Sequence, residues 1–322
     1  MTVKAEQKPK PIPTDLETNW CYFKGEIMPL ADAKVSVATH ALNYGTACFE
    51  GIRAYWNDNQ QQMYVLKMRE HYQRFLRNCG LIKIKLNQTV EDLCNITLEV
   101  LRKNQYKQDV YIRPLAFKAT PTIKLMLSGL EDEVTIYTFP MGNYVDISSG
   151  LNVSISSWQR INDNAIPARG KICGAYVNSA LAVDDALQAG FDEAIFLTKD
   201  GNVSEGSSCN LFIIRGKELI TPAVTEDILE GITRAAIIEL VSAEEDLGLR
   251  VIERPIDRSE LYQADEVFFC GTGVQVSPVT RIDDRAIGNG TPGKFTLEIQ
   301  KRYFAAARGD NDKYMHWVTP VY

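Results

Sequence analysis

The chain has 322 residues, 45% of them hydrophobic and 24% charged, an ordinary globular balance that is long enough for two domains. Its net charge is −6 and it has no basic block, which argues against nucleic acid and anionic membranes as partners. No apolar run approaches the roughly 18 residues of a membrane span, and the polar, proline-rich start is unlike an export signal. Seven cysteines without C-x-x-C spacing favour reduced thiols in the cytoplasm over a disulfide framework or a zinc site.

The first 140 residues predict short strands and helices. Residues 35–37 are strand-like, and 62–67 read as a strand that leads into a helix over 69–76. A further helix is expected after Thr89, because Asp92 three positions later completes a capping-box pattern. One face of that helix is expected to be buried: Val90, Leu93, Thr97, Val100 and Leu101.

A strand predicted over 109–115 carries a tyrosine and an arginine on one face. Tyr111 and Arg113 flank Ile112, and alternate residues of a strand point to the same side. A guanidinium beside a phenol suits an acidic substrate. Residues 134–139 form a further apolar strand, which we expect to end the first domain.

The second half of the chain predicts more strands and two helices. The strands are expected over 151–157, 194–198, 209–214 and 266–270. The helix after Lys171 has one apolar face: Val177, Leu181, Ala182 and Leu187. A helix opening at Glu230 and running to Gly248 presents free N–H groups and a positive dipole end, a natural seat for phosphate.

A glycine-rich loop near the end has the glycine and lysine spacing of a Walker A motif, from Gly288 to Lys294. Phe295 stands where that motif needs a Ser or Thr for magnesium, and no apolar strand precedes the loop. With Thr291 as N-cap and Pro292 as the first helical residue, the segment is better explained as the start of a helix.

Two stretches contain the main candidates for catalytic and cofactor-binding residues. Lys171 lies among small residues in 167–178, which leave room for a molecule against its amine; a lysine beside glycine is by itself usually a turn residue. The second stretch, 200–212, contains Glu205. Together they resemble the paired signatures of fold-type IV pyridoxal-phosphate enzymes, and within that group the branched-chain amino acid aminotransferases.

The resemblance implies a mixed α/β chain of two domains with the cofactor in the cleft between them. The smaller N-terminal domain would span 1–139, the interdomain loop 140–150 and the larger cofactor-binding domain 151–322.

The resemblance also implies how pyridoxal 5′-phosphate is held. Lys171 would form the Schiff base and move the proton of the substrate α-carbon. Glu205 would keep the ring nitrogen protonated, and Tyr176 would hydrogen-bond the phenolic oxygen. The phosphate would be bound by Arg69 from an R-E-H-x-x-R segment, by the G-I-T-R helix start and by the G-T-G turn: Arg69, Ile232, Thr233 and Thr272.

The substrate pocket is implied by a Y-G-x-x-x-F-E-G-I-R segment that begins at Tyr44 and by the Y-I-R-P-L strand. Tyr44 would reach the neighbouring subunit's site, and His40 beside it is expected to be structural. Phe49 and Gly51 would contact the substrate side chain. The remaining pocket residues are Tyr111 for the α-carboxylate, Arg113 for the side-chain carboxylate of glutamate, Tyr144 from the loop, and the amides of Thr272 and Gly273. Met141 departs from the tryptophan of many bacterial relatives and leaves the side-chain preference open.

The implied activity is exchange of the amino group between branched-chain L-amino acids (leucine, isoleucine, valine) and 2-oxoglutarate, by a homodimer or higher homo-oligomer. Three same-fold alternatives remain: a D-amino acid transaminase, an (R)-amine transaminase and an aminodeoxychorismate lyase. A non-catalytic binding protein on the same scaffold is a fourth. The Tyr111 and Arg113 strand speaks against the first group, and the presence of both Lys171 and Glu205 against the last.

Overall fold

The computed structural model describes residues 18–142 and 149–322. Its contacts group into two compact units. The unit that we call the Lys171 unit comprises the described residues of Lys8–Gly142, Gly170–Ala175 and Ala305–Tyr322. The Glu205 unit comprises those of Asn143–Arg169 and Tyr176–Phe304. Each unit is built from separate stretches of chain, and the domain boundaries expected at 139 and 151 stay a prediction.

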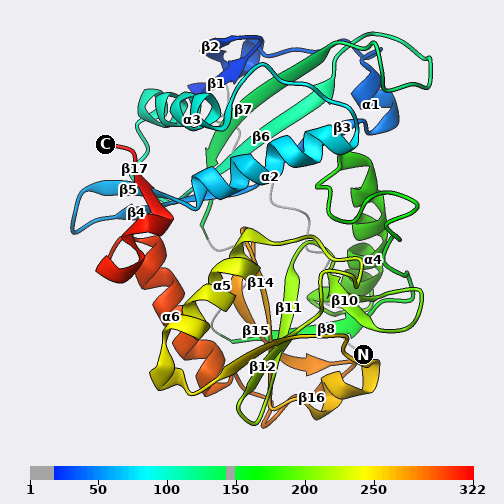
Figure 1. The fold of residues 1–322 in the computed structure, drawn as a ribbon, viewed down its shortest axis with the longest axis vertical. Coiled ribbons are helices and arrows are strands. Elements are labelled where there is room, and N and C mark those ends of the chain that lie inside the picture. Colours follow the sequence, from blue (N-terminus) through cyan, green and yellow to red (C-terminus); the bar gives the residue numbers. More distant parts are fainter. Residues whose placement is uncertain (1–17, 143–148) are drawn as a thin grey trace. The chain divides into compact units, whose positions relative to one another are not determined.

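The Lys171 unit is built on a sheet with the strand order β17-β5-β4-β6-β7-β1-β2, with β3 paired to β6 (Figure 1). All of its pairings are antiparallel. The strands are β1 (Trp20–Phe23), β2 (Glu26–Pro29), β3 (Ala47–Phe49), β4 (Ile52–Asn57), β5 (Gln62–Leu66), β6 (Val110–Lys118), β7 (Asp132–Pro140) and β17 (Val318–Pro320). Its helices are α1 (His40–Tyr44), α2 (Met68–Leu81) and α3 (Val90–Asn104).

The two long helices of this unit pack on each other and on the sheet, α2 against β3 and α3 against β1 and β7. The capping box predicted at the start of α3 is confirmed: Thr89 Oγ1 accepts from the Asp92 amide at 3.2 Å, and the Asp92 carboxylate accepts from the Thr89 amide at 2.8 Å. Leu93, Thr97, Val100 and Leu101 are buried, as their helical spacing predicted. The strand expected at 35–37 is wrong, because that segment has no sheet partner and both of its valines are exposed.

The Glu205 unit is built on a mixed sheet with the order β10-β9-β8-β15-β14-β11-β12-β13, with β16 paired to β15. The pairs β8 with β9, β8 with β15 and β12 with β13 are parallel. The strands are β8 (Leu151–Ile155), β9 (Glu193–Leu197), β10 (Val203–Gly206), β11 (Asn210–Arg215), β12 (Glu218–Thr221), β13 (Arg250–Glu253), β14 (Glu266–Gly271), β15 (Gln275–Ile282) and β16 (Arg285–Ala286).

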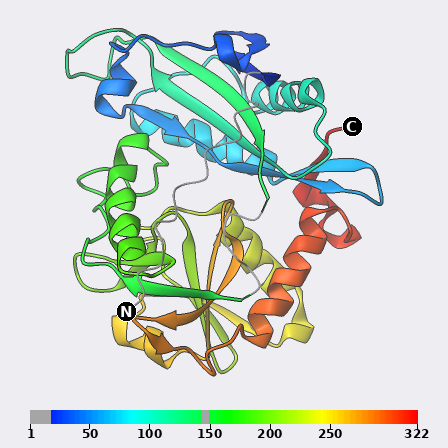
Figure 2. The ribbon, with the colours of Figure 1, turned by 180° about the vertical axis from the view of Figure 1, so that it is seen from behind.

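The helices α4 (Tyr176–Gln188) and α5 (Ile232–Ala243) belong to this unit, and α6 (Lys294–Ala307) begins in it. Helix α5 covers one face of the sheet: it lies in front of the strands in Figure 1 and behind them in Figure 2. The sheet core is apolar and fully buried around Ile195, Leu211, Ile213, Val267 and Phe269.

Of the apolar face predicted for α4, only Ala182 is buried. Val177, Leu181 and Leu187 are exposed, whereas Ser179, Ala182 and Ala186 are buried. The physical reason is close packing, since the small side chains of α4 lie against Ala194 and Phe196 of β9.

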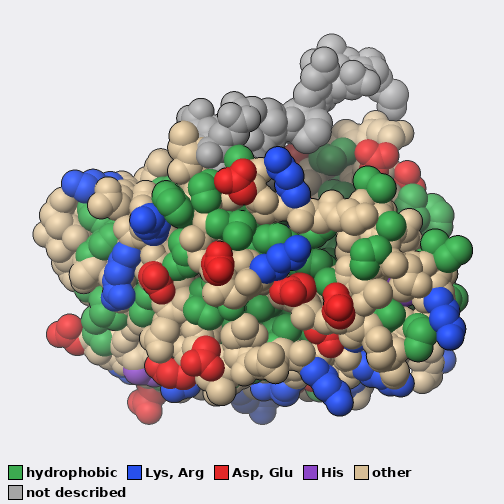
Figure 3. Space-filling view, turned by 90° about the horizontal axis from the view of Figure 1, so that it is seen from above, with side chains coloured by type: hydrophobic (Ala, Val, Ile, Leu, Met, Phe, Trp, Pro, Cys, Tyr) green, Lys and Arg blue, Asp and Glu red, His purple; other side chains and the backbone are tan. Residues whose placement is uncertain are grey.

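On the face seen from above in Figure 3, acidic and basic side chains are interspersed among hydrophobic ones. No basic block gathers on the part of that face that the structure describes, in keeping with the sequence. Among the described residues, no helix combines the length and the apolar character that crossing a membrane requires.

Candidate active site

Lys171 lies in a short segment that the Lys171 unit holds by its backbone. The Lys171 carbonyl accepts a hydrogen bond from the Phe49 amide at 3.0 Å, and Ile172 forms a β-bridge with Cys48. The Lys171 ammonium nitrogen is 4.8 Å from the centre of the Phe49 ring. Burial lowers the pKa of Lys171 to about 8. At neutral pH about a tenth of the amine is therefore unprotonated, some 300-fold more than for an ordinary lysine.

A buried carboxylate, Glu50, organises the groups beside Lys171. It lies between β3 and β4, and its side chain is fully buried. Arg74 binds both of its oxygens, through Nε at 2.8 Å and Nη2 at 2.7 Å, and His71 Nδ1 lies 2.8 Å from Oε2. Burial alone would raise the pKa of Glu50, but Arg74 and His71 lower it to about 2, so it is ionised. The same burial lowers the pKa of His71, which is therefore neutral at pH 7 and donates its Nδ1 proton to Glu50.

The sheet next to Lys171 presents the residues that the resemblance assigns to the substrate. Arg113 Nη2 donates to the Tyr111 hydroxyl at 3.0 Å, so the two side chains share a face as predicted. The Arg113 guanidinium also lies 4.3 Å from the centre of the Phe49 ring. A Cβ at Gly51 would lie 2.2 Å from the Tyr111 hydroxyl, so a side chain there would displace that tyrosine. Phe49, Gly51, Tyr111 and Arg113 are thus brought together with Lys171.

Arg69 is not brought to this group. Its side chain is 59% exposed and pairs with Glu91 of α3 at 2.8 Å. Residues 69 and 74 are five apart and lie on different faces of α2, whereas His71 and Arg74 are three apart and share one. The arginine of the R-E-H-x-x-R segment that lies beside Lys171 is therefore Arg74, which the sequence reading missed. The signal that could have found it is its three-residue spacing from His71.

The Glu205 unit surrounds the Glu205 carboxylate with hydrogen-bond donors. Glu205 is on β10, a strand that the sequence reading did not separate from the loop before β11. Its Oε1 pairs with Arg160 Nη2 at 2.9 Å, and its Oε2 accepts from Asn210 Nδ2 at 2.9 Å and from the Leu229 amide at 3.1 Å. Glu205 itself is 5% exposed. Arg160, missed from the sequence, balances the buried charge.

Helix α5 begins beside this carboxylate, at Ile232 and with Gly231 as its N-cap. No side chain caps it, which leaves the first turn without the usual Ser, Thr, Asn or Asp partner. A Cβ at Gly231 would lie 1.9 Å from Asn210 Oδ1, so the close approach of helix and Asn210 requires glycine. Ile232 and Thr233 form the first turn, as the predicted phosphate seat requires, with Thr233 buried.

The turn between β14 and β15 completes this group. Thr272 and Gly273 lie in it, and β14 pairs with β11 so that Cys270 is opposite Asn210. The structure therefore brings together Glu205, the start of α5 and the G-T-G turn within one unit. A Cβ at Gly273 would meet nothing within 4 Å, so the backbone there is open to approach.

Three further residues that the sequence singled out lie at the ends of helices: Tyr176, Tyr44 and His40. Tyr176 is the first residue of α4 and is partly buried. Tyr44 ends α1, is 39% exposed and donates to the Ile123 carbonyl at 2.8 Å. Tyr144 lies outside the described residues. His40 is fully buried, with Nδ1 2.7 Å from Thr46 Oγ1, which confirms its structural role.

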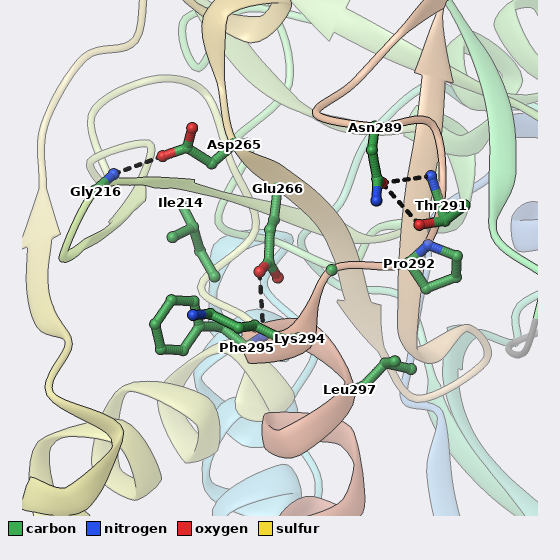
Figure 4. A pocket seen from close by; sticks show the side chains of 11 residues that line it. Ile214, Gly216, Asp265, Glu266, Asn289, Thr291, Pro292, Lys294, Phe295 and Leu297 are labelled. Carbon is green, nitrogen blue, oxygen red and sulfur yellow. Dashed lines mark hydrogen bonds between the residues drawn. The ribbon is translucent and has the colours of Figure 1, made fainter.

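A pocket of about 590 Å³ lies in the Glu205 unit at the start of α6, around the glycine-rich loop (Figure 4). The expectation that Thr291 caps this helix is wrong. The helix begins at Lys294, and Glu266 of β14 accepts from the amides of Phe295 and Thr296 at 3.1 and 2.8 Å. A carboxylate brought by the sheet is a stronger partner for the positive helix end than a hydroxyl. Two amides of the first turn are thus bound to Glu266, where a nucleotide phosphate would have to compete for them.

Comparison with known proteins identifies the family of the chain. The family model described as "Amino-transferase class IV" matches residues 47–282. A probable branched-chain-amino-acid aminotransferase of Aquifex aeolicus (strain VF5) is 49% identical over 304 residues, which are 94% of this chain and 97% of that protein. The chain belongs to the class IV aminotransferases. The match spans the site residues of both units from Phe49 to Gly273.

Solved structures of class IV aminotransferases agree in fold. The branched-chain aminotransferase of the archaeon Thermoproteus uzoniensis, solved with norvaline, has a TM-score of 0.89 at 39% identity and covers 94% of this chain and 99% of its own. The enzyme of Thermobaculum terrenum, solved in its PLP-form, has a TM-score of 0.90 at 36% identity, over 95% of this chain and 99% of its own. The predictions of a fold-type IV chain and of an aminotransferase are confirmed.

Proposed function

We propose that this class IV aminotransferase exchanges the amino group between branched-chain L-amino acids and 2-oxoglutarate, with pyridoxal 5′-phosphate as cofactor. The observation that carries the proposal is the partly buried Lys171 amine, which lies 4.8 Å from the centre of the Phe49 ring with its pKa lowered to about 8, beside Arg113 and Tyr111. The named relatives and neighbours support the substrate class.

The donor set fits the cofactor. A phosphate suits Arg74, a buried guanidinium, and the first turn of α5, where Gly231 provides no side-chain cap. We propose that Arg74, Ile232, Thr233 and Thr272 serve the phosphate, with Arg74 in the place expected for Arg69. Glu205 suits a protonated ring nitrogen, and Tyr176 the phenolic oxygen. When bound, pyridoxal phosphate supplies an aldehyde that condenses with amines and a ring that withdraws electrons.

Each of these residues of the chain would then have its own role in binding or proton transfer. Because its pKa is lowered, Lys171 keeps about a tenth of its amine unprotonated at neutral pH, and this form serves as the base that takes the proton of the substrate α-carbon. Phe49 and Gly51 provide an apolar wall for leucine, isoleucine or valine. Arg113 and Tyr111 provide the donors for carboxylates, so that the same pocket accepts glutamate. Tyr144 and the amides of Thr272 and Gly273 complete the proposed pocket.

Comparing amino donors tests the proposal. Purified protein with added pyridoxal phosphate is mixed with L-leucine, L-glutamate or D-alanine, and the change in near-visible absorbance is followed in a single turnover. We expect fast reaction with both L-amino acids and little with D-alanine. Faster reaction with D-alanine would contradict the substrate class, and a protein that stays colourless with the cofactor would contradict the enzyme.

We further propose a homodimer or a higher homo-oligomer that forms through an apolar face of the Lys171 unit. Val37, Leu42, Ile123 and Leu125 are 84%, 64%, 84% and 80% exposed. The hydrogen bond from Tyr44 to Ile123 joins the two segments that carry them. Exposed apolar residues gathered in this way are typical of an interface, and we propose that Tyr44 reaches a partner subunit from it. Ile123→Asp should lower the mass measured by light scattering, and an unchanged mass would contradict this interface.

The proposed location is the cytoplasm, where thiols stay reduced. All seven cysteines are free in the structure and six are buried. Labelling of thiols in freshly lysed cells should find them unoxidised.

A further inference from the structure

Glu50 is a buried charge to which neither the sequence reading nor the proposed mechanism assigns a role. Its backbone amide donates to the Pro114 carbonyl at 2.9 Å, and the preceding residue, Phe49, is bonded to the Lys171 carbonyl. The backbone of Glu50 is therefore held by β6, and that of the preceding Phe49 by the Lys171 segment. A fully buried carboxylate is costly unless its partners satisfy it.

The partners of Glu50 are both on one face of α2. Arg74 makes a two-point contact with the carboxylate, at 2.8 and 2.7 Å, which fixes the plane of the guanidinium as well as its position. The neutral His71 donates a third hydrogen bond at 2.8 Å. His71 and Arg74 are 4% and 5% exposed, so water does not compete for these contacts.

The charged groups that act on Lys171 lie on α2, on β6 and in the link between β3 and β4. Arg74 from α2 and Arg113 from β6 oppose its protonation, whereas Glu50 and Tyr111 favour it. His71 of α2 is neutral, and burial raises the pKa of Cys173, in the same segment as Lys171, to about 11, so this thiol carries no charge at pH 7. Glu50 is thus the carboxylate that balances two arginines at this site.

We propose that Glu50 is a positioning residue for the reaction, an inference that rests on the proposed role of Lys171. The negative charge of Glu50 fixes Arg74 and sets the protonation balance of the Lys171 amine. Arg74 and Glu50 then act on Lys171 with opposite signs. Loss of Glu50 leaves the arginine charges unbalanced and favours the free amine, whereas loss of Arg74 favours the ammonium.

The test measures Lys171 itself and needs no transamination. The full-length protein without added cofactor is treated with an amine-acylating reagent across pH 6 to 10, and the rate of labelling at Lys171 is read by peptide mass spectrometry. We expect Glu50→Gln to lower the pH midpoint by about half a unit or more, which makes Lys171 roughly threefold more reactive at pH 7. Arg74→Gln should raise the midpoint, and Glu50→Asp should restore much of the wild-type value.

Glu91→Gln is the matched control, because it removes a carboxylate that pairs with an arginine at the surface. Its midpoint should equal that of the wild type. If Glu50→Gln does not fold, the double variant Glu50→Gln/Arg74→Gln replaces the ion pair by two amides. Its midpoint should lie below that of Arg74→Gln alone, since only the charge of Glu50 differs.

Equal midpoints for Glu50→Gln and the wild type, or shifts of the same sign for Glu50→Gln and Arg74→Gln, would overturn the proposal. General loosening of the fold cannot produce opposite shifts. Opposite shifts in a protein that does not react with L-leucine would uphold the role of Glu50 and contradict the proposed function, so the two failures are distinguishable.

Discussion

Replacing Arg113 by methionine tests how one pocket accepts both apolar and acidic substrates. Methionine keeps the length and the apolar stem of the side chain but removes the guanidinium that lies over Phe49 and bonds Tyr111. If this guanidinium meets the side-chain carboxylate of glutamate, Arg113→Met weakens the reaction of glutamate and leaves that of leucine nearly unchanged.

The magnitude follows from the partly buried position of Arg113. Two unit charges about 4 Å apart attract by about 4 kcal/mol at an effective dielectric near 20. Removing both from water offsets much of this, and hydrogen bonds between charged groups contribute a net 1.5–3 kcal/mol, roughly. We therefore expect kcat/KM for L-glutamate to fall about 10- to 150-fold.

The assay compares single-turnover kinetics of L-glutamate and L-leucine at one pH. The ratio of the two rates is decisive, because Arg113 also lowers the pKa of Lys171 and its loss affects both substrates alike. Arg69→Met is the control, since its exposed guanidinium pairs with Glu91 and should leave the ratio unchanged. An equal loss for both substrates in Arg113→Met would refute the reasoning.

Single side chains elsewhere in the chain should affect stability or turnover in ways that can be measured. Lys171→Met should flatten the pH dependence of the free energy of unfolding of the cofactor-free protein. The pKa of the wild-type amine is lowered to about 8, so between pH 8 and about 10.4 the unfolded state binds more protons than the folded state. The stability of the wild type therefore rises over this range, by roughly 3 kcal/mol in all. Denaturant titrations at pH 7.5 and 10.5 measure this, and equal slopes for both proteins would contradict it. Glu205→Gln should lower kcat about 100-fold or more while retaining the cofactor colour, because the ring nitrogen loses its anionic partner; a kcat within a few-fold of the wild type would exclude that role. Thr89→Ala should cost about 1 kcal/mol of stability, seen as a lower Tm with unchanged kinetics, because it removes the acceptor of the α3 capping box.

Motifs that act over a few residues were readable in the sequence. The capping box at Thr89 needs only a hydroxyl and a carboxylate three positions apart, and the shared face of Tyr111 and Arg113 needs only the alternation of a strand. The stretches around Lys171 and Glu205 likewise carry their residue types in the local order that marked the family.

Predictions failed where a distant segment decided the outcome. The buried face of α4 follows its small residues, because β9 packs closely against Ala182 and Ala186. The start of α6 is set by Glu266 from β14, which binds the amides of Phe295 and Thr296, whereas the sequence predicted Thr291 as the N-cap. The helix propensity and the hydrophobic periodicity of a segment depend on that segment alone, and they do not specify the surface against which it packs.

The sequence by itself therefore determined the family, the pair Lys171 and Glu205 and most of the helices and strands, since these depend on neighbours along the chain. Only the tertiary structure decided which charges surround each of them. Arg74 rather than Arg69 lies beside Lys171 because α2 turns the face that carries Arg74 to the sheet. Glu50, in the link between β3 and β4, binds Arg74 there. Electrostatic effects act through space, and the distances that set them are fixed by the register and packing of segments that are far apart in the chain.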